Sequence, residues 1–527
     1  MKKIFDFIKN KKTIFVCAVA LIVAIVAFLV FGWIGLWYEV LVGGIVAIAL
    51  TDIKKHGLLK ILSIILLLIT LISYILPGRN GLEQIGIADL LVNYFSIVLQ
   101  NFSYIVLFIL SVGGFYGVLN KTPSYKKLLD NIVTFLKPLN KKVIYIIILI
   151  FAIITSLTSM TIPLFIFIPF VVSIILLLGY DKLVALSATV GSIIVGYIGG
   201  MFVNFINPNT YGINTFEEFI GLDNKFDNVF PKLLLLFVGI ALLIYFVSKH
   251  IKNVEEKKVK YELSENSELL IAEVKGSYKD IKTWPLIVIL SLTFIILVLG
   301  MVPWNELFSI DIFNKFHTWL TGLKIKDIAV LPTIISQDLP ALGGWRTTRN
   351  ILASYVYMSM LIVFATLIIS LVNKIKFNDV IDNFAEGVKK MLPIVALITV
   401  AYTVLICSYN NGFLEIIISN YGKFNYVISS LLAFLGCILN VDTIWIIAGV
   451  FSNIIGLITD ESIYGSVAVL LQGIYGVFQL VGPTSLILII GLTYLDIPYT
   501  TWLKYIWRFV IALIILLAAV TALVIIL

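Results

Sequence analysis

The sequence predicts an all-α polytopic membrane protein, and its composition and its long apolar runs are the observations behind that prediction. Of its 527 residues, 60% are hydrophobic and only 13% are charged, whereas a soluble chain carries about 25% charged residues. Its mean hydropathy is +1.07. So few charges leave too little polar surface to keep a chain of this size in water, so we expect lipid to be its main solvent.

Apolar runs follow one another along the whole chain. A bilayer core of roughly 30 Å requires about 20 apolar residues in each spanning helix. The runs lie near residues 13–32, 34–51, 57–76, 100–119, 143–157, 162–179, 183–203, 230–248, 284–302, 350–372, 391–409, 424–439, 443–459, 462–482 and 503–527. Several are too short, or too interrupted by Pro, Gly and Asn, to span alone, which predicts about 11 transmembrane helices plus two re-entrant hairpins.

Lysine placement predicts how these helices are oriented. Residues 2–12 contain five lysines, and further basic patches lie at 54–60, 121–142 and 249–282. Because basic residues collect on the inner side of a membrane, we expect a multi-pass protein of the plasma membrane with a cytoplasmic N-terminus. The segment 1–33 resembles a signal peptide, but no small-residue cleavage site follows its apolar run, so it is expected to be a retained transmembrane helix.

The longest charged stretch, residues 249–283, is expected to be a cytoplasmic linker. It separates two halves, residues 34–248 and 284–527. The lysine count predicts that the first helix of the first half begins on the outer side of the membrane and that of the second half on the inner side. The halves are therefore expected to be inverted repeats. The segment 123–142 is apolar on one side and basic on the other, which favours an interfacial helix over a solvated connector.

Two short matches support common descent of the halves. Residues 86–95 resemble 377–386, and residues 202–212 resemble 478–488, in the same order. Two duplicated halves of opposite orientation make a pseudo-symmetric protein that can open to either side of the membrane in turn. This arrangement is typical of a transporter.

Four segments interrupt apolar runs with polar residues or proline, at 154–165, 199–214, 437–445 and 479–486. Irregular backbone at membrane depth must be buried or line a polar cavity. Each half has one polar-tipped hairpin followed by one helix interrupted at Asn-Pro or Gly-Pro, and freed amide groups suit a carboxylate whereas freed carbonyls suit a cation. The candidate substrate- or ion-binding residues are Ser156, Thr158, Ser159, Asn204, Asn207, Asn209, Thr210, Asn440, Asp442, Thr443, Thr484 and Ser485.

Asp442 stands out because a carboxylate between membrane runs is costly and is a functional candidate by default. It could pair with a cationic group, titrate as a proton carrier or help to hold Na⁺. The alternative is that its turn lies at the outer surface and that Asp442 is simply in contact with water.

The sequence contains no motif for nucleotide, metal or covalent chemistry. Walker, HExxH and GxSxG motifs are missing, and no Cys and His residues cluster, so we expect neither an enzyme nor a cofactor, apart from Na⁺ or H⁺ as a coupling ion. His56, His250 and His317 are expected in loops. Lys504 and Arg508 are expected to anchor the last helix at the inner face.

Four stretches together resemble the YfcC-like, C4-dicarboxylate anaerobic carrier-like family. They are residues 112–125, 176–186, 207–213 and 482–509, and the last, with PTS followed by IPY and WLK, is the most specific. The family belongs to the ion transporter superfamily, with the divalent anion/sodium symporters. The resemblance implies a scaffold domain that forms a homodimer, two opposed re-entrant hairpins and elevator-type movement of a transport domain. Its members are assigned to dicarboxylates, and relatives to arginine/ornithine exchange.

The chain departs from the family where the substrate is expected to bind. Its first hairpin reads SLTSMT, at 156–161, without a carboxylate, and its second reads NVDTIW, at 440–445, in place of Pro-Ser-Gly-Ser. Tyr475, Phe478 and Gln479 stand where the family often has Asp, Ser and Asn. These changes predict a different substrate, a different coupling ion, or both.

The leading hypothesis is therefore a secondary transporter for a small polar organic solute such as an amino acid or a carboxylate. It works by alternating access, is coupled to Na⁺ or H⁺ or acts as an exchanger, and has no nucleic-acid partner. One alternative is a transport-inactive membrane scaffold or a channel-like protein. Another is a membrane enzyme for lipid-linked substrates, which would need a carboxylate pair or metal cluster that the sequence lacks.

Overall fold

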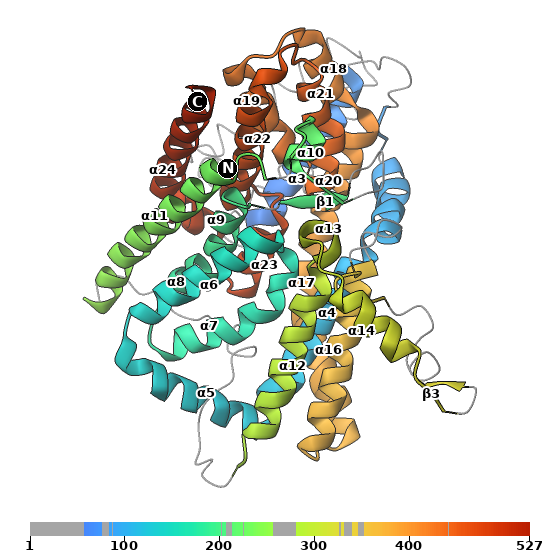
Figure 1. The fold of residues 1–527 in the computed structure, drawn as a ribbon, viewed down its shortest axis with the longest axis vertical. Helices are drawn as coiled ribbons and strands as arrows, with labels where there is room; N and C mark the ends of the chain where they lie inside the picture. Colours follow the sequence, from blue (N-terminus) through green and yellow to red (C-terminus); the bar gives the residue numbers. More distant parts are fainter. Residues whose placement is uncertain are drawn as a thin grey trace, which may run out of the picture.

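The computed structural model describes residues 57–75, 84–86, 88–201, 203–206, 213–224, 226–256, 281–325, 328–330, 340–345, 353–440 and 442–526. Helices account for most of these residues (Figure 1). Two antiparallel strand pairs accompany them, β1 (Asn204–Ile206) with β2 (Ile213–Thr215) and β3 (Lys324–Ile325) with β4 (Ile328–Ala329). The helices predicted at 13–32 and 34–51, and most of the charged linker, lie outside the described residues.

The first half follows a fixed order of elements. They are α3 (Gly57–Ile75), the π-helix η1 (Asp89–Tyr94), α4 (Phe95–Lys121), α5 (Pro123–Leu136), η2 (Lys137–Leu139), α6 (Lys142–Thr158), the 3₁₀ helix η3 (Ile162–Phe167), α7 (Ile168–Leu177), α8 (Lys182–Leu186), η4 (Ser187–Gly191), α9 (Ser192–Ile198), β1, β2, α10 (Phe216–Ile220) and α11 (Val229–Glu255). Helices α8, η4 and α9 are continuous, and Asp181 begins them by accepting a hydrogen bond from the Val184 amide (2.9 Å).

The second half contains α12 (Trp284–Met301), α13 (Trp304–Phe308), α14 (Ile312–Thr321), β3, β4, α16 (Ala353–Val372), α17 (Phe377–Asn411), α18 (Phe413–Tyr421), α19 (Tyr426–Leu439), α20 (Thr443–Ile446), η6 (Ile447–Phe451), α21 (Ser452–Ile455), η7 (Glu461–Ile463), α22 (Tyr464–Val481), α23 (Leu486–Tyr494) and α24 (Tyr499–Ile526). From α4 and from α17 onward the two halves have a similar order of elements. Each has a long helix, a short helix, two short apolar helices joined at a polar tip, a helix that ends at a break and a closing long helix. They differ after the break, where the first half has β1, β2 and α10 and the second half has α23.

Membrane-spanning helices dominate the fold, as the sequence predicts. Within the described part of the chain, seven helices are long and apolar enough to cross a bilayer. They lie at Val92–Lys121, Val229–Glu255, Trp284–Met301, Ser354–Val372, Phe377–Asn411, Glu461–Tyr494 and Tyr499–Ile526. The shorter apolar helices fall at the two predicted hairpins, at α8–α9 and at α3, whereas the total of 11 spans stays a prediction.

The chain bends sharply between α5 and α6, since the segments Pro123–Leu139 and Lys142–Thr158 meet at 109°. Tyr125 and Leu129 on its apolar side are buried, and Lys127 donates a hydrogen bond to the carbonyl of Ile281 (2.8 Å), just before α12. Figure 1 shows α5 at the end of the molecule where α12 begins. This geometry agrees with the expected amphipathic helix, and its place at a membrane surface stays a prediction.

Three glycines bring the backbones of α4 and α17 into contact. A Cβ atom on Gly387 would lie 2.1 Å from the carbonyl oxygen of Gly113, and one on Gly117 would lie 2.2 Å from that of Asn383. Small residues permit such close crossings between helices in membranes. The long helices α4 and α17 therefore pack against each other along glycine-lined surfaces.

A buried ion pair joins α10 to the first turn of α11. The Nζ atom of Lys232 lies 2.5 Å from Oε1 of Glu217, and the two side chains are 1% and 0% exposed. Glu217→Gln is expected to lower the free energy of unfolding by about 3–5 kcal/mol, because it leaves the ammonium group buried without its counter-charge. The apparent melting temperature in detergent measures this loss.

The double variant Glu217→Gln/Lys232→Met should recover most of that stability, since removing both charges removes the uncompensated one. Glu255→Gln, at the exposed end of α11, is the matched control and should leave the melting temperature unchanged. A double variant no more stable than the single one would show that the pair does not act through charge compensation.

Candidate functional site

The first polar tip contacts the first helix break. Helix α6 ends at Thr158, and Ser159 turns the chain in the left-handed region (φ 55°). The Ser156 hydroxyl donates to the carbonyl of Gly199 at the end of α9 (2.9 Å), and the Met201 amide donates to the carbonyl of Ser156 (3.1 Å). The Thr158 hydroxyl is used locally, donating to the carbonyl of Ile154 (2.6 Å). Two of the four interrupted segments thus meet.

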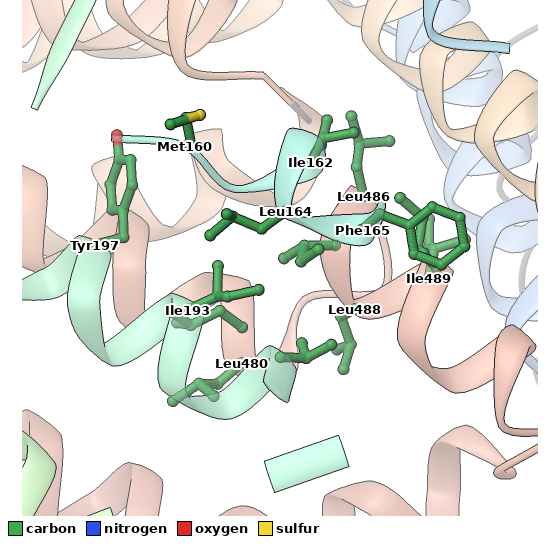
Figure 2. Packing of buried hydrophobic residues seen from close by; sticks show 14 of the residues in the cluster. Met160, Ile162, Leu164, Phe165, Ile193, Tyr197, Leu480, Leu486, Leu488 and Ile489 are labelled. Atoms are coloured by element: carbon green, nitrogen blue, oxygen red, sulfur yellow. The ribbon is translucent and has the colours of Figure 1, made fainter. Parts of the chain in front are cut away.

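This tip also reaches the second half of the chain. Figure 2 shows apolar residues of the tip, of α9 and of the segment around α23 packed together, namely Met160, Ile162, Leu164, Phe165, Ile193, Tyr197, Leu480, Leu486, Leu488 and Ile489. Phe165 makes an edge-to-face contact with Tyr494 of α23 (centroids 6.0 Å apart). The first hairpin therefore packs against α23 of the second half as well as against α9 of the first half.

The second tip contacts the second helix break in the same way. Helix α19 ends at Leu439, and the side-chain amide of Asn440 donates to the carbonyl of Gly436 (3.0 Å). Thr484, in the break between α22 and α23, donates to the carbonyl of Ile438 (2.9 Å). Ser485 caps α23 and donates to Oε1 of Gln479 (2.7 Å).

Asp442 begins the returning helix of the second hairpin. Its carboxylate accepts a hydrogen bond from the Ile444 amide (3.0 Å), and α20, η6 and α21 continue as one helix to Ile455. The side chain is half-buried and interacts with the phenols of Tyr402 in α17 and Tyr475 in α22, both of which are buried. These neighbours are buried aromatic side chains of two other helices, and the place of the turn relative to the membrane surface stays a prediction.

Three tyrosines from three helices surround Asp442 and Thr443; we call Tyr197, Tyr402 and Tyr475 the tyrosine cluster. The Tyr197 hydroxyl in α9 lies 3.4 Å from Oγ1 of Thr443, which links the first half to the second tip. The rings of Tyr197 and Tyr475 are 5.4 Å apart. No local motif marks Tyr197 or Tyr402 in the sequence; a tyrosine within an apolar run is the one feature that could point to them.

The side chain of Gln472 caps the C-terminal end of α9. Its Nε2 atom donates to the carbonyls of Tyr197 (3.2 Å), Ile198 (3.3 Å) and Gly200 (3.0 Å). The side chain comes from α22 of the other half and is buried. The last carbonyls of a helix carry partial negative charge, and here the two N–H groups of a side-chain amide are shared among three carbonyls at and just beyond the helix end.

Helix N-termini, which carry partial positive charge, and helix C-termini, which carry partial negative charge, meet in this region. The positive N-termini of the helix that begins at Thr443 and of α23 face it, as do the negative C-termini of α9, α19 and α22. Asp442 places a full negative charge at one positive end, whereas the neutral Ser485 caps the other. The site thus offers one acidic corner and one corner suited to a carboxylate.

The remaining predicted site residues lie in or beside a strand pair. Asn204 begins β1, paired with Thr215 of β2, where the sequence predicts a continuing helix; the strand pair corrects that expectation. Asn207, Asn209 and Thr210 lie outside the described residues, so their part in the site stays a prediction.

Two histidines correct another expectation. His250 and His317 lie in α11 and α14 rather than in loops. Hydropathy ends the predicted helix at residue 248, but the following Lys, Asn and Glu residues sustain the helix to Glu255. His250 Nε2 lies 2.8 Å from the buried Oδ2 of Asp181.

The helical bundle and its meeting point of two polar tips and two helix breaks define the class as a multi-pass membrane transporter. The sequence model of the C4-dicarboxylate anaerobic carrier family matches residues 14–526. The chain therefore belongs to that family, which confirms the resemblance found in its sequence.

Two solved structures are distantly similar. The YdaH transporter of Alcanivorax borkumensis is 13% identical, with 90% of this chain and 98% of that chain covered and a TM-score of 0.36. MtrF of Neisseria gonorrhoeae, described as illuminating a class of antimetabolite efflux pumps, is 14% identical, with coverages of 90% and 97% and a TM-score of 0.38. A search of curated proteins found no match.

Proposed function

We propose that this protein is a secondary transporter for a small zwitterionic solute of the amino-acid class. The observation that carries the proposal is Asp442, a carboxylate placed at one positive helix end beside the tyrosine cluster. An ammonium group would bind at Asp442 and the hydroxyl of Thr443, and a carboxylate would bind at the N-terminus of α23, capped by Ser485. A C4-dicarboxylate, which the family name suggests, would place a second negative charge against Asp442.

Alternating access is the mechanism we propose for it. The similar order of elements in the two halves supports inverted repeats, with the tips as re-entrant hairpins that enter from opposite sides. The glycine crossing of α4 and α17 suits a rigid scaffold, which would include Tyr402, and the tips, the breaks, Tyr197 and Tyr475 suit a moving transport domain. A homodimer in the plasma membrane with a cytoplasmic N-terminus completes the proposal.

Coupling is proposed to run through Asp442 rather than through the end of α9. Half-helix C-termini are places where transporters hold Na⁺, but the amide of Gln472 already engages three carbonyls there. Asp442 can alternate between the substrate ammonium and a proton, which gives H⁺ coupling; it can also exchange one solute for another.

Uptake into proteoliposomes tests the function, with L-aspartate and succinate as the deciding pair. L-Aspartate and succinate share a carbon chain and two carboxylates and differ in one ammonium group. L-Alanine and propionate, with one carboxylate each, differ in the same group. Uptake of the ammonium-bearing member of each pair is expected to be faster by roughly tenfold, the value of one charge-assisted hydrogen bond. Initial rates are measured under Na⁺ and H⁺ gradients and in counterflow.

Faster uptake of succinate would overturn the zwitterion proposal in favour of a dicarboxylate. Movement of no solute in the panel under any gradient would favour a transport-inactive scaffold or a channel-like protein.

A further inference from the structure

A cavity of about 420 Å³ lies between the last turns of α11 and the first turns of α24, apart from the tips and breaks. The two helices close the first and second halves of the chain. Its lining comes from both helices and includes Phe246, Lys249, Lys504, Trp507, Arg508 and Phe509. The proposed transport function uses none of them.

One end of the cavity is strongly basic. Lys249, Lys504 and Arg508 are exposed cations that converge from the two helices, and none of the lining residues is acidic. His250, the other basic residue of the lining, is engaged by the buried Asp181. Three fixed positive charges in one cavity predict an anionic ligand with more than one oxygen acceptor.

The other end is apolar. Leu242, Phe246, Phe509 and Ala512 lie deeper along the two helices, and Phe246 stacks on Phe509 with ring centroids 5.8 Å apart. At the basic end, the exposed Trp507 ring lies 5.2 Å from the guanidinium carbon of Arg508. Tryptophan beside basic residues is typical of helices at the membrane interface.

We propose that this cavity binds an anionic phospholipid, which joins α11 of the first half to α24 of the second. The phosphate oxygens contact Lys249, Lys504 and Arg508, and the start of an acyl chain follows Phe246 and the other apolar residues. Basic pockets between transmembrane helices suit phospholipid head groups. A free phosphate would use the basic end alone and leave the apolar end unexplained.

The test measures the melting temperature of delipidated protein in neutral detergent as lipid is added. Cardiolipin and phosphatidylglycerol should raise it, cardiolipin at the lower concentration because it carries two phosphates, whereas phosphatidylcholine should not. Lys504→Gln/Arg508→Gln should raise the half-saturating concentration of both anionic lipids by roughly tenfold or more. Ala512→Phe, which fills the apolar end and keeps every charge, should weaken binding similarly.

Lys252→Gln/Lys315→Gln is the matched control, because it removes two exposed lysines that do not line the cavity; it should respond like the unaltered protein. An unchanged lipid response of Lys504→Gln/Arg508→Gln would overturn the proposal. An equal shift with inorganic phosphate or glycerol phosphate would assign the site to a free anion instead. Should the double variant fail to fold, Ala512→Phe decides, and a normal response from it overturns the proposal.

Discussion

Asp442→Asn is expected to lower the initial rate of zwitterion uptake by roughly 10- to 100-fold, since a hydrogen bond to a charged group contributes about 1.5–3 kcal/mol. Asparagine caps helices as well as aspartate does, so it keeps the bond to the Ile444 amide (3.0 Å) and the returning helix of the hairpin. The variant thus removes the charge and leaves the fold. Uptake in proteoliposomes, together with the melting temperature with and without substrate, measures both effects.

Asp460→Asn is the matched control. Asp460 also caps a helix, accepting from the Ser462 amide (3.0 Å), but it lies outside the site. Hydrogen bonds from Ser462 hold the pKa of Asp460 below its usual value, so it too is charged at neutral pH. Uptake by this variant should match that of the unaltered protein. A well-folded Asp442→Asn protein with normal uptake would remove Asp442 from the substrate site.

Gly387→Ala is expected to lower the free energy of unfolding by about 3 kcal/mol or more, at the upper end of the range for overpacking. The added methyl group would lie 2.1 Å from the carbonyl oxygen of Gly113 and 2.9 Å from the Cα atom of Gly117. These are backbone atoms, so no rotamer change relieves the clash, and α4 and α17 must separate. Yield of monodisperse protein and the melting temperature measure the loss.

Gly57→Ala makes the same chemical change at the start of α3, where a new Cβ atom meets no atom of the described residues within 4 Å. It should be neutral or slightly stabilising, since alanine is a better helix former than glycine. Equal stability of the two variants would show that the α4–α17 crossing is looser than described.

The membrane class, the polar tips and the helix breaks could be predicted, because each depends on composition or on local sequence. Composition predicted a multi-pass membrane protein, and the two similar halves predicted a transporter, the class that the family match confirms. Proline and polar residues within apolar runs predicted both tips and both breaks, because backbone groups freed at membrane depth need polar partners. The Ser156–Gly199 and Thr484–Ile438 bonds supply such partners.

Features that depend on helix pairing could not be predicted. Gln472 and Tyr402 sit within apolar runs, and only the packing of α22 on α9 and of α17 on the second tip gives them a role. The strand pair β1–β2 was missed because its segment follows an apolar run that resembles a helix. His250 was misplaced because hydropathy marks where a helix stops being apolar, not where it ends.

The side chain of Gln472 links α22 to the end of α9. Pulling the two helices apart would remove this contact from the buried carbonyls of Ile198 and Gly200 and from the Nε2 group of Gln472, and each buried group left unsatisfied costs about 1–3 kcal/mol. In the alternating-access mechanism proposed above, we therefore expect α9 and α22 to move together. Sliding would then occur between this pair and other helices, and not along the boundary between the two halves of the sequence.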